Sequence, residues 1–266
     1  MLNSIQRAII KKDLRTIVFN KRLFPVLLIV PFVFSIALPS IFIVSISFLP
    51  ESSPEFQQLL QIMPSIKAGS NIQITAITLL LNTVIPVFFI LIPIMASSVM
   101  AASSFVGEKE KRTLETLLYS PISLKQIFQS KIFAALSLSM MVTFASFIAM
   151  VITVQLEMMF LMNHNISLDF LNWIIILIAL APTLSLLSIT LIVNGSAKSQ
   201  TVEESQQRSV FLIIPVFLLL VGQFSGIILI NAWLLLIVAL IFLILTILLM
   251  KRANKKFTYE ALLKQS

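Results

Sequence analysis

Residues 23–50 read LFPVLLIVPFVFSIALPSIFIVSISFLP, a run of 28 residues without a charged side chain. A helix needs about 20 mostly apolar residues to cross the hydrocarbon core of a bilayer, so this stretch is long enough for one tilted span. The whole chain has the same character, because 58% of its 266 residues are hydrophobic and only 11% are charged. Soluble domains carry about 25% charged residues. The sequence therefore predicts an integral membrane protein and excludes a soluble or disordered chain.

Charged residues divide the rest of the chain into further apolar blocks. The last block, 209–250, is too long for one helix, and Asn231 divides it in two. Backbone groups in hydrocarbon must be satisfied internally, so spans of this length are helices and not the shorter strands of a barrel. We expect an all-α, polytopic membrane protein with one transmembrane domain, 23–250. The predicted spans are about 23–49, 74–105, 132–156, 170–193, 210–230 and 232–250.

The basic residues predict the orientation. Of the 19 Lys and Arg residues, 18 lie in segment 1–22, the loops 107–131 and 194–208, and the tail 251–266. Cytoplasmic loops are enriched in Lys and Arg, so both termini are expected in the cytoplasm. Trp173 and Trp233 then fall at the outer ends of spans 4 and 6, where interfacial anchors are expected. The net charge of +8 is thus explained by basic residues that set the orientation of the chain in the membrane. No soluble basic domain is present that would bind nucleic acid.

The N-terminal segment 1–22 is amphipathic. On a helical wheel its cations gather within one sector, whereas its apolar residues occupy the other side. This pattern predicts a helix in the membrane interface, with its apolar face in lipid and its cations towards headgroups or cytosol. The alternative is a basic segment that only sets the topology. The cations are Arg7, Lys11, Arg15 and Arg22, and the apolar residues are Leu2, Ile5, Ile9, Ile10, Leu14 and Ile17.

The loop after the second span, 107–131, reads GEKEKRTLETLLYSPISLKQIFQSK. Glu108 and Arg112 are spaced as an i,i+4 ion pair in the favourable order, and three leucines follow on one edge. Pro121 cannot donate a backbone hydrogen bond and restricts the residue before it, so a first helix is expected to end there. A solvated connector would not need the leucine edge, so we interpret this segment as a docking element.

A second helix is expected to follow the proline. Ser123 and Gln126 have the spacing of a capping box, in which each side chain satisfies the backbone N–H of the other. This helix would run directly into span 3. The loop therefore predicts a helix, a tight turn and a second helix just beneath the membrane.

The segment 108–123 resembles the signature of type-2 ABC (ABC-2) transporter permeases, an acidic and basic run followed by Gly-Thr-Leu-Glu, two leucines, a turn with proline and a serine. Arg112 stands where the family has glycine, and Lys131 fits the lysine that usually enters the next span. The loop 196–207, SAKSQTVEESQQ, resembles the family's second cytoplasmic loop, with Ser205 replacing the usual alanine. The resemblance, with six spans and an amphipathic N-terminus, is to membrane subunits of drug, sodium and antimicrobial-peptide exporters.

This resemblance implies a permease in a bacterial cytoplasmic membrane that pairs with a second permease as a homodimer or heterodimer. Two separate ATPase subunits would bind its cytoplasmic helices and drive a hydrophobic drug, antimicrobial peptide, lipid or ion out of the cell. ATP would be bound by the partner, since the five glycines of this chain never form a phosphate-binding loop. The residues implied in coupling to the ATPase are Glu108, Glu110, Arg112, Thr113, Glu115 and Leu118, with Glu203 and Glu204 secondary.

Enzymatic and metal chemistry lack support in the sequence. His164 is the only histidine and the chain has no cysteine, so three or four convergent zinc ligands are not available. We interpret His164 as an exposed residue in an outer loop spanning 157–169. No His-Glu-x-x-His or Gly-x-Ser-x-Gly motif is present. The chain is therefore expected to hold no metal or cofactor and not to be an enzyme.

Polar groups within the spans are few. No charged residue lies in the middle of a predicted span, which weakens an ion-driven secondary carrier as the alternative function. Asn82, Gln155 and Gln223 either line a substrate path or bond between helices, and the second role is favoured. Gly222 and Gly226 have the spacing of a close helix contact, at a dimer face or an outer bend. A membrane sensor or immunity subunit that does not transport is the remaining alternative.

Overall fold

The computed structural model describes residues 4–21, 23–49, 72–110, 123–165, 167–196, 199, 201–224 and 231–256. This part of the chain is helical, as the all-α prediction required. The elements are α1 (Ser4–Val18), α2 (Leu23–Phe32), η1 (Val33–Ala37), α3 (Leu38–Phe48), α5 (Ile72–Phe89), α6 (Leu91–Glu110), α8 (Leu124–Met162), α9 (Phe170–Ile175), η2 (Ile176–Leu180), α10 (Ala181–Ser196), α11 (Val202–Gln206), η3 (Gln207–Leu212), α12 (Ile213–Phe224) and α13 (Ala232–Lys256).

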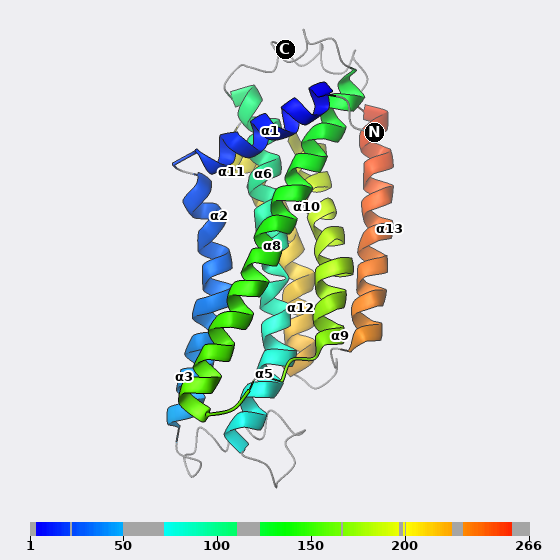
Figure 1. Ribbon diagram of the computed structural model, residues 1–266. Coiled ribbons are helices and arrows are strands. Elements are labelled where there is room, and N and C mark those ends of the chain that lie inside the picture. The colour runs from blue at the N-terminus through cyan, green and yellow to red at the C-terminus, as the bar shows by residue number, and fades with distance from the viewer. Residues whose placement is uncertain are drawn as a thin grey trace.

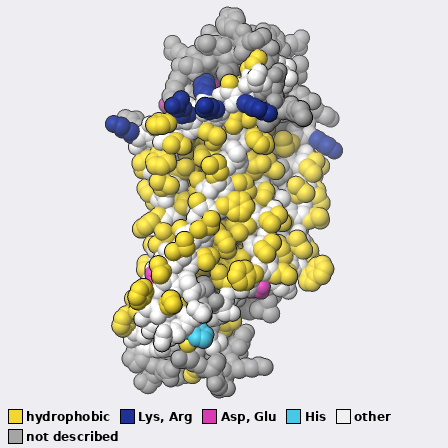
Figure 2. Space-filling model, in the orientation of Figure 1, with side chains coloured by type: hydrophobic (Ala, Val, Ile, Leu, Met, Phe, Trp, Pro, Cys, Tyr) yellow, Lys and Arg dark blue, Asp and Glu magenta, His cyan; other side chains and the backbone are white. Residues whose placement is uncertain are grey.

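Six helical segments of the described chain are long and apolar enough to cross a membrane, which confirms the polytopic fold. They are Leu23–Phe48, Ile72–Glu108, Gln126–Met162, Phe170–Ser196, Val202–Gln223 and Ala232–Lys251. In Figure 1 the long helices run side by side as one bundle, and α1 crosses one end of it. Lys and Arg side chains mark that end along the edge of an apolar belt (Figure 2), so we call it the basic end.

The centre of the bundle is formed by spans 2 and 4, which are the most buried of the six. The reason lies in the small side chains of α6, where residues 96–104 read ASSVMAASS. Small residues let neighbouring backbones approach closely, and α6 packs along both α8 and α10. Span 6 is the least buried and faces outward over most of its length. Figure 2 shows apolar side chains over the outside of the bundle, as expected of a surface that lipid covers.

Prolines interrupt three of the spans, and each break coincides with an irregular turn. Segment η1 lies between Pro31 and Pro39, and η2 ends just before Pro182. The second span breaks at Ile90, between α5 and α6. Near this break, hydroxyl groups from α8 and α10 supply hydrogen bonds to α6: Ser139 Oγ donates to the Pro93 carbonyl at 2.9 Å, and Ser188 Oγ to the Ile94 carbonyl at 3.2 Å. These hydroxyl groups thus join α8 and α10 to α6 just beyond the break.

The capping box predicted at Ser123 is confirmed. Ser123 Oγ accepts from the Gln126 backbone N–H, and the Gln126 side chain accepts from the Ser123 backbone N–H. The helix that begins there, α8, continues without interruption through Met162. It ends at Asn163, whose backbone adopts the left-handed conformation with φ of 51°. The outer loop is therefore shorter than the sequence indicated, because residues 157–162 are still helical.

The expectation that Trp173 is an interfacial anchor is wrong. Its side chain is only 1% exposed and lies in the core. The indole ring stands 5.2 Å from the Phe89 ring and 5.2 Å from the Phe147 ring, centroid to centroid. Aromatic rings at such distances attract one another, so packing against α5 and α8 takes precedence over the interface. Trp233, in contrast, is 76% exposed, as an anchor would be.

Candidate functional site

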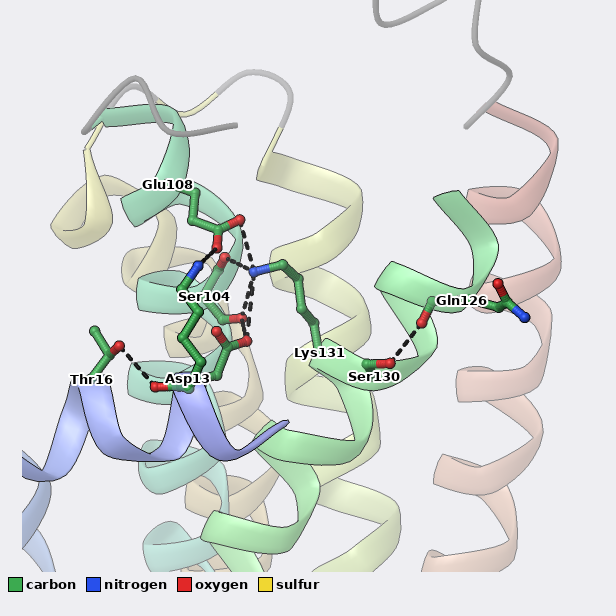
Figure 3. Close-up of polar contacts among 8 residues, drawn as sticks. Asp13, Thr16, Ser104, Glu108, Gln126, Ser130 and Lys131 are labelled. Atoms are coloured by element: carbon green, nitrogen blue, oxygen red, sulfur yellow. Dashed lines mark hydrogen bonds and ion pairs between the residues drawn. The ribbon is translucent and has the colours of Figure 1, made fainter. Parts of the chain in front are cut away.

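The two ends of the 107–131 segment lie together at the basic end. Glu108 stands in the last turn of α6, just before the segment's central part, and Lys131 stands in α8, just after it. Lys131 Nζ lies 2.9 Å from Glu108 Oε2, so an ion pair joins the two ends. Figure 3 shows both side chains converging with Asp13 of α1 and Ser104 of α6. With Lys12 of α1, these residues form what we call the root cluster.

Hydrogen bonds and ion pairs join the polar groups of the root cluster into one network. Lys131 Nζ donates to the Ser104 carbonyl at 2.7 Å and to Ser104 Oγ at 3.1 Å. Ser104 Oγ in turn donates to Asp13 Oδ2 at 2.6 Å. Asp13 Oδ2 also lies 3.5 Å from Lys131 Nζ. On the outer side, Lys12 Nζ donates to Glu108 Oε1 at 3.1 Å.

The charges of the cluster balance, with two carboxylates facing two ammonium groups. The Lys131 and Asp13 side chains are 3% and 6% exposed, whereas Lys12 is 55% exposed. A buried charge is tolerated only when it is paired and hydrogen-bonded, and the bonds among α1, α6 and α8 meet that condition. The Lys131 ammonium also lies 5.7 Å from the Phe105 ring centroid, a cation–π distance. The cluster therefore fixes α1 against both ends of the 107–131 segment.

The second predicted loop meets the first one beside this cluster. Glu110, the last residue of α6, accepts a hydrogen bond from the Val202 backbone N–H at 3.3 Å. Val202 begins α11, and the Thr201 side chain caps this helix by accepting from the Glu204 N–H. Glu110, Glu203 and Glu204 are all exposed. The contact thus places three accessible carboxylates at the basic end.

The comparison with protein families identifies the chain. Residues 7–225 match the family model described as ABC-2 family transporter protein. The chain belongs to the ABC-2 transporter family. It is accordingly a multi-pass permease subunit of an ABC-2 transporter, a kind of subunit that lacks ATPase activity of its own. A search of curated proteins found no match.

The remaining coupling residues suggested by the ABC-2 resemblance lie outside the described residues. These are Arg112, Thr113, Glu115 and Leu118, together with the turn at Pro121. Glu108 forms ion pairs with Lys12 and Lys131, and the expected i,i+4 pair with Arg112 lies outside the described residues. Its side chain is 11% exposed, which leaves little of it available to another protein. Glu108 thus anchors the end of α6 to α1 and α8, and its implied coupling role stays a prediction.

The N-terminal segment of this ABC-2 chain forms the helix that its pattern predicted. Arg7, Lys11 and Arg15 are exposed on α1, and Arg22 lies outside the described residues. Part of the apolar side does not face outward, since Ile9 and Ile17 are buried with Asp13. The helix thus docks on α6 and α8 with one face and leaves its cations on another.

The amides within the spans take different environments. Asn82 Oδ1 accepts from the Asp169 N–H at 2.7 Å, and its Nδ2 donates to the Ser167 carbonyl at 2.9 Å, which ties the loop before α9 to α5. Gln155 donates to Asn165 in the same loop at 2.9 Å. Gln223 stands near the end of α12, where its amide finds no hydrogen-bond partner in the structure as described. Gly222 precedes it, and Gly226 lies outside the described residues.

Sequence reasoning missed Lys12, Asp13 and Ser104 as site residues. A signal for Asp13 was present, because it stands four residues after Ile9 and four before Ile17, on the helical stripe that becomes buried. A charged residue on such a stripe requires a buried partner of opposite sign. Among the described residues no group of three His, Asp or Glu side chains forms a metal site.

Proposed function

We propose that the chain is the permease of an ATP-driven exporter, with its basic end in the cytoplasm and two separate ATPase subunits docked there. The root cluster is the observation that supports this proposal most directly. Glu108 and Lys131 flank the segment that resembles the family's coupling helices, and both are bonded to α1. A force applied to that segment would therefore reach three helices at once.

The route of such a force follows from the contacts. An ATPase that closes on ATP and displaces residues 109–130 would pull on the end of α6 and the start of α8. Because α6 lies at the centre of the bundle and packs on α8 and α10, the movement would reach the core of the permease. The Glu110 bond to Val202 would carry it to α11, which leads through η3 into α12. Packed helices joined by such polar contacts can switch between two discrete arrangements.

The orientation is supported by the distribution of charge, with 18 of 19 basic residues on one side of the predicted spans. The other elements of the proposal are a second permease copy, identical or related, and a bacterial cytoplasmic membrane. The substrate would be a hydrophobic drug, an antimicrobial peptide, a lipid or an ion.

The docking assignment is tested with Glu115→Arg, which reverses a charge in the implied coupling helix without touching the root cluster. The matched control is Lys251→Glu, which reverses the charge of an exposed residue near the C-terminal end of α13, outside both cytoplasmic loops. We expect Glu115→Arg to abolish co-purification of the candidate ATPase and the stimulation of its ATP turnover, and Lys251→Glu to preserve both. Intact co-purification and stimulation in Glu115→Arg would show that docking occurs elsewhere.

A second experiment separates an exporter from the alternatives. The permease and ATPase are reconstituted in vesicles, and movement of a hydrophobic fluorescent dye is followed with ATP or with an ion gradient. An exporter requires ATP and continues when ionophores collapse the gradient. Transport that needs only the gradient would establish a secondary carrier, and ATP turnover that moves none of the candidate substrates would support a sensor.

A further inference from the structure

A groove lies between α1 and α8 at the edge of the apolar belt. Its volume is about 570 Å³, within the range of about 300–1,000 Å³ typical of ligand pockets. The α1 side contributes cations and apolar side chains in alternation, and α8 contributes Phe133. The lining residues are Arg7, Ile10, Lys11, Leu14, Arg15, Val18, Phe19 and Phe133.

The three cations of the groove form no ion pair with the part of the chain that the structure describes. They recur every four residues, so they stand on one face of α1 and repel one another. The ion pairs of the described residues involve Lys12 and Lys131 and none of these three. Arg15 instead lies 5.7 Å from the Phe19 ring centroid. The only acid of α1, Asp13, is buried against Lys131 on another face. This arrangement of charge is complementary to an anion.

The apolar lining indicates what kind of anion would fit. Phe133 is 49% exposed, and its helix continues the exposed apolar stripe down the bundle with Met141 at 64%, Phe144 at 43% and Ile148 at 57%. These positions follow the three- and four-residue spacing of one helix face. A molecule whose charged head contacts α1 could therefore lay an acyl chain along α8. An acidic protein surface or a free phosphate ion could neutralise the cations but would not cover the apolar stripe.

We propose that the α1–α8 groove binds an anionic phospholipid, with its phosphate at Arg7, Lys11 and Arg15 and its acyl chain against Phe133. Basic pockets at the cytoplasmic side of spans bind such headgroups. Figure 2 shows the row of Lys and Arg side chains along the border of the apolar belt, where headgroups would lie. The site is distinct from the coupling loops, because it uses a face of α1 that the root cluster leaves free.

The test uses a fluorescent reporter beside the groove. Phe133→Trp places an indole there, and Trp233→Phe removes the exposed native indole, while Trp173 remains buried and out of reach of lipid. The purified chain in detergent micelles is titrated with brominated phosphatidylglycerol or with brominated phosphatidylcholine, whose bromine atoms quench nearby indoles. We expect phosphatidylglycerol to bind more tightly, by about fivefold for each cation that contacts the headgroup.

Matched charge variants separate a site from diffuse attraction. Lys11→Gln with Arg15→Gln removes two charges from the groove, and Lys21→Gln with Lys251→Gln removes two exposed charges elsewhere at the basic end. The groove pair should reduce the preference for phosphatidylglycerol by about 30-fold, and the control pair should leave it nearly unchanged. Equal losses in the two pairs, or equal quenching by the two lipids in the parent reporter, would overturn the proposal.

Two further measurements keep the test independent of the reporter and of the proposed function. Native mass spectrometry of the chain with Phe133 intact counts retained phosphatidylglycerol, and the groove pair should lose the most strongly retained molecule. Co-purification of the candidate ATPase is measured in parallel. Loss of the ATPase with lipid binding intact would show that the groove serves a protein partner instead, which also overturns the proposal.

Discussion

Replacing Lys131 with methionine is the sharpest perturbation of the root cluster. Methionine keeps much of the length and apolar volume of lysine but removes the ammonium group and its contacts to Glu108 Oε2 at 2.9 Å and the Ser104 carbonyl at 2.7 Å. Asp13, 6% exposed, would then keep only the Ser104 hydroxyl among the partners described here. Breaking a buried ion pair on one side costs about 3–5 kcal/mol in the free energy of unfolding.

The neighbouring lysine supplies the matched control. Lys12 is 55% exposed and contacts Glu108 at 3.1 Å, so Lys12→Met should cost less than about 1 kcal/mol. A second comparison is Asp13→Asn with Lys131→Met, which removes both charges of the inner pair. Removing both partners leaves less uncompensated charge, so the double variant should be more stable than Lys131→Met alone.

The assay is thermal unfolding of the purified chain in detergent, followed by loss of the monodisperse peak in size-exclusion chromatography. A cost of about 3–5 kcal/mol corresponds to a decrease in apparent Tm of roughly 10 °C for a chain of this size. Equal Tm values for Lys131→Met and Lys12→Met would refute the reasoning, because exposure and hydrogen bonding would then not distinguish the two lysines. A double variant less stable than Lys131→Met would refute the charge balance.

Substitutions at three further sites test other parts of the structure, at Trp173 and Ser123 by the same Tm assay and at Asn82 by hydrogen exchange. Trp173→Ala should cost about 3–5 kcal/mol by opening a cavity beside Phe89, whereas Trp173→Phe should cost much less, since the indole N–H has no partner in the described structure; equal costs would contradict the packing role. Ser123→Ala removes the capping box and should cost about 1 kcal/mol, and no change would mean that the start of α8 contributes nothing. Asn82→Ala should free the loop before α9 and raise its hydrogen exchange while leaving exchange at the basic end unchanged; unaltered exchange in residues 163–169 would contradict the anchoring role.

The sequence was sufficient for the spans, because the length of an uncharged apolar run is set directly by bilayer thickness. The start of α8 was equally accessible, since a capping box involves only residues three apart in the chain. Helix α1 was predicted from the helical period of its cationic and apolar residues. All three are local or compositional properties, so no knowledge of the packed structure was needed to predict them.

The root cluster could not be predicted because its pairs join residues far apart in the chain. Asp13 contacts Ser104 and Lys131 because α1 lies across the end of the bundle. For Glu108 the local rule pointed only to Arg112, and the pairs with Lys12 and Lys131 depend on tertiary packing. The environment of the Trp173 side chain was predicted wrongly for a related reason. Its position at the end of a span does not show whether the indole faces lipid or packs against Phe89 and Phe147.

The central claim is that an ATPase docks on the segment between Glu108 and Lys131. Because the chain contains no cysteine, Leu118→Cys introduces a single thiol to which a photoactivated crosslinker can be attached. Lys251→Cys, exposed on α13 at the same end, is the control. The account predicts a crosslink to the co-expressed ATPase from position 118, enhanced when a non-hydrolysable ATP analogue closes the ATPase, and none from position 251. Crosslinking from neither position, or equally from both, would contradict it.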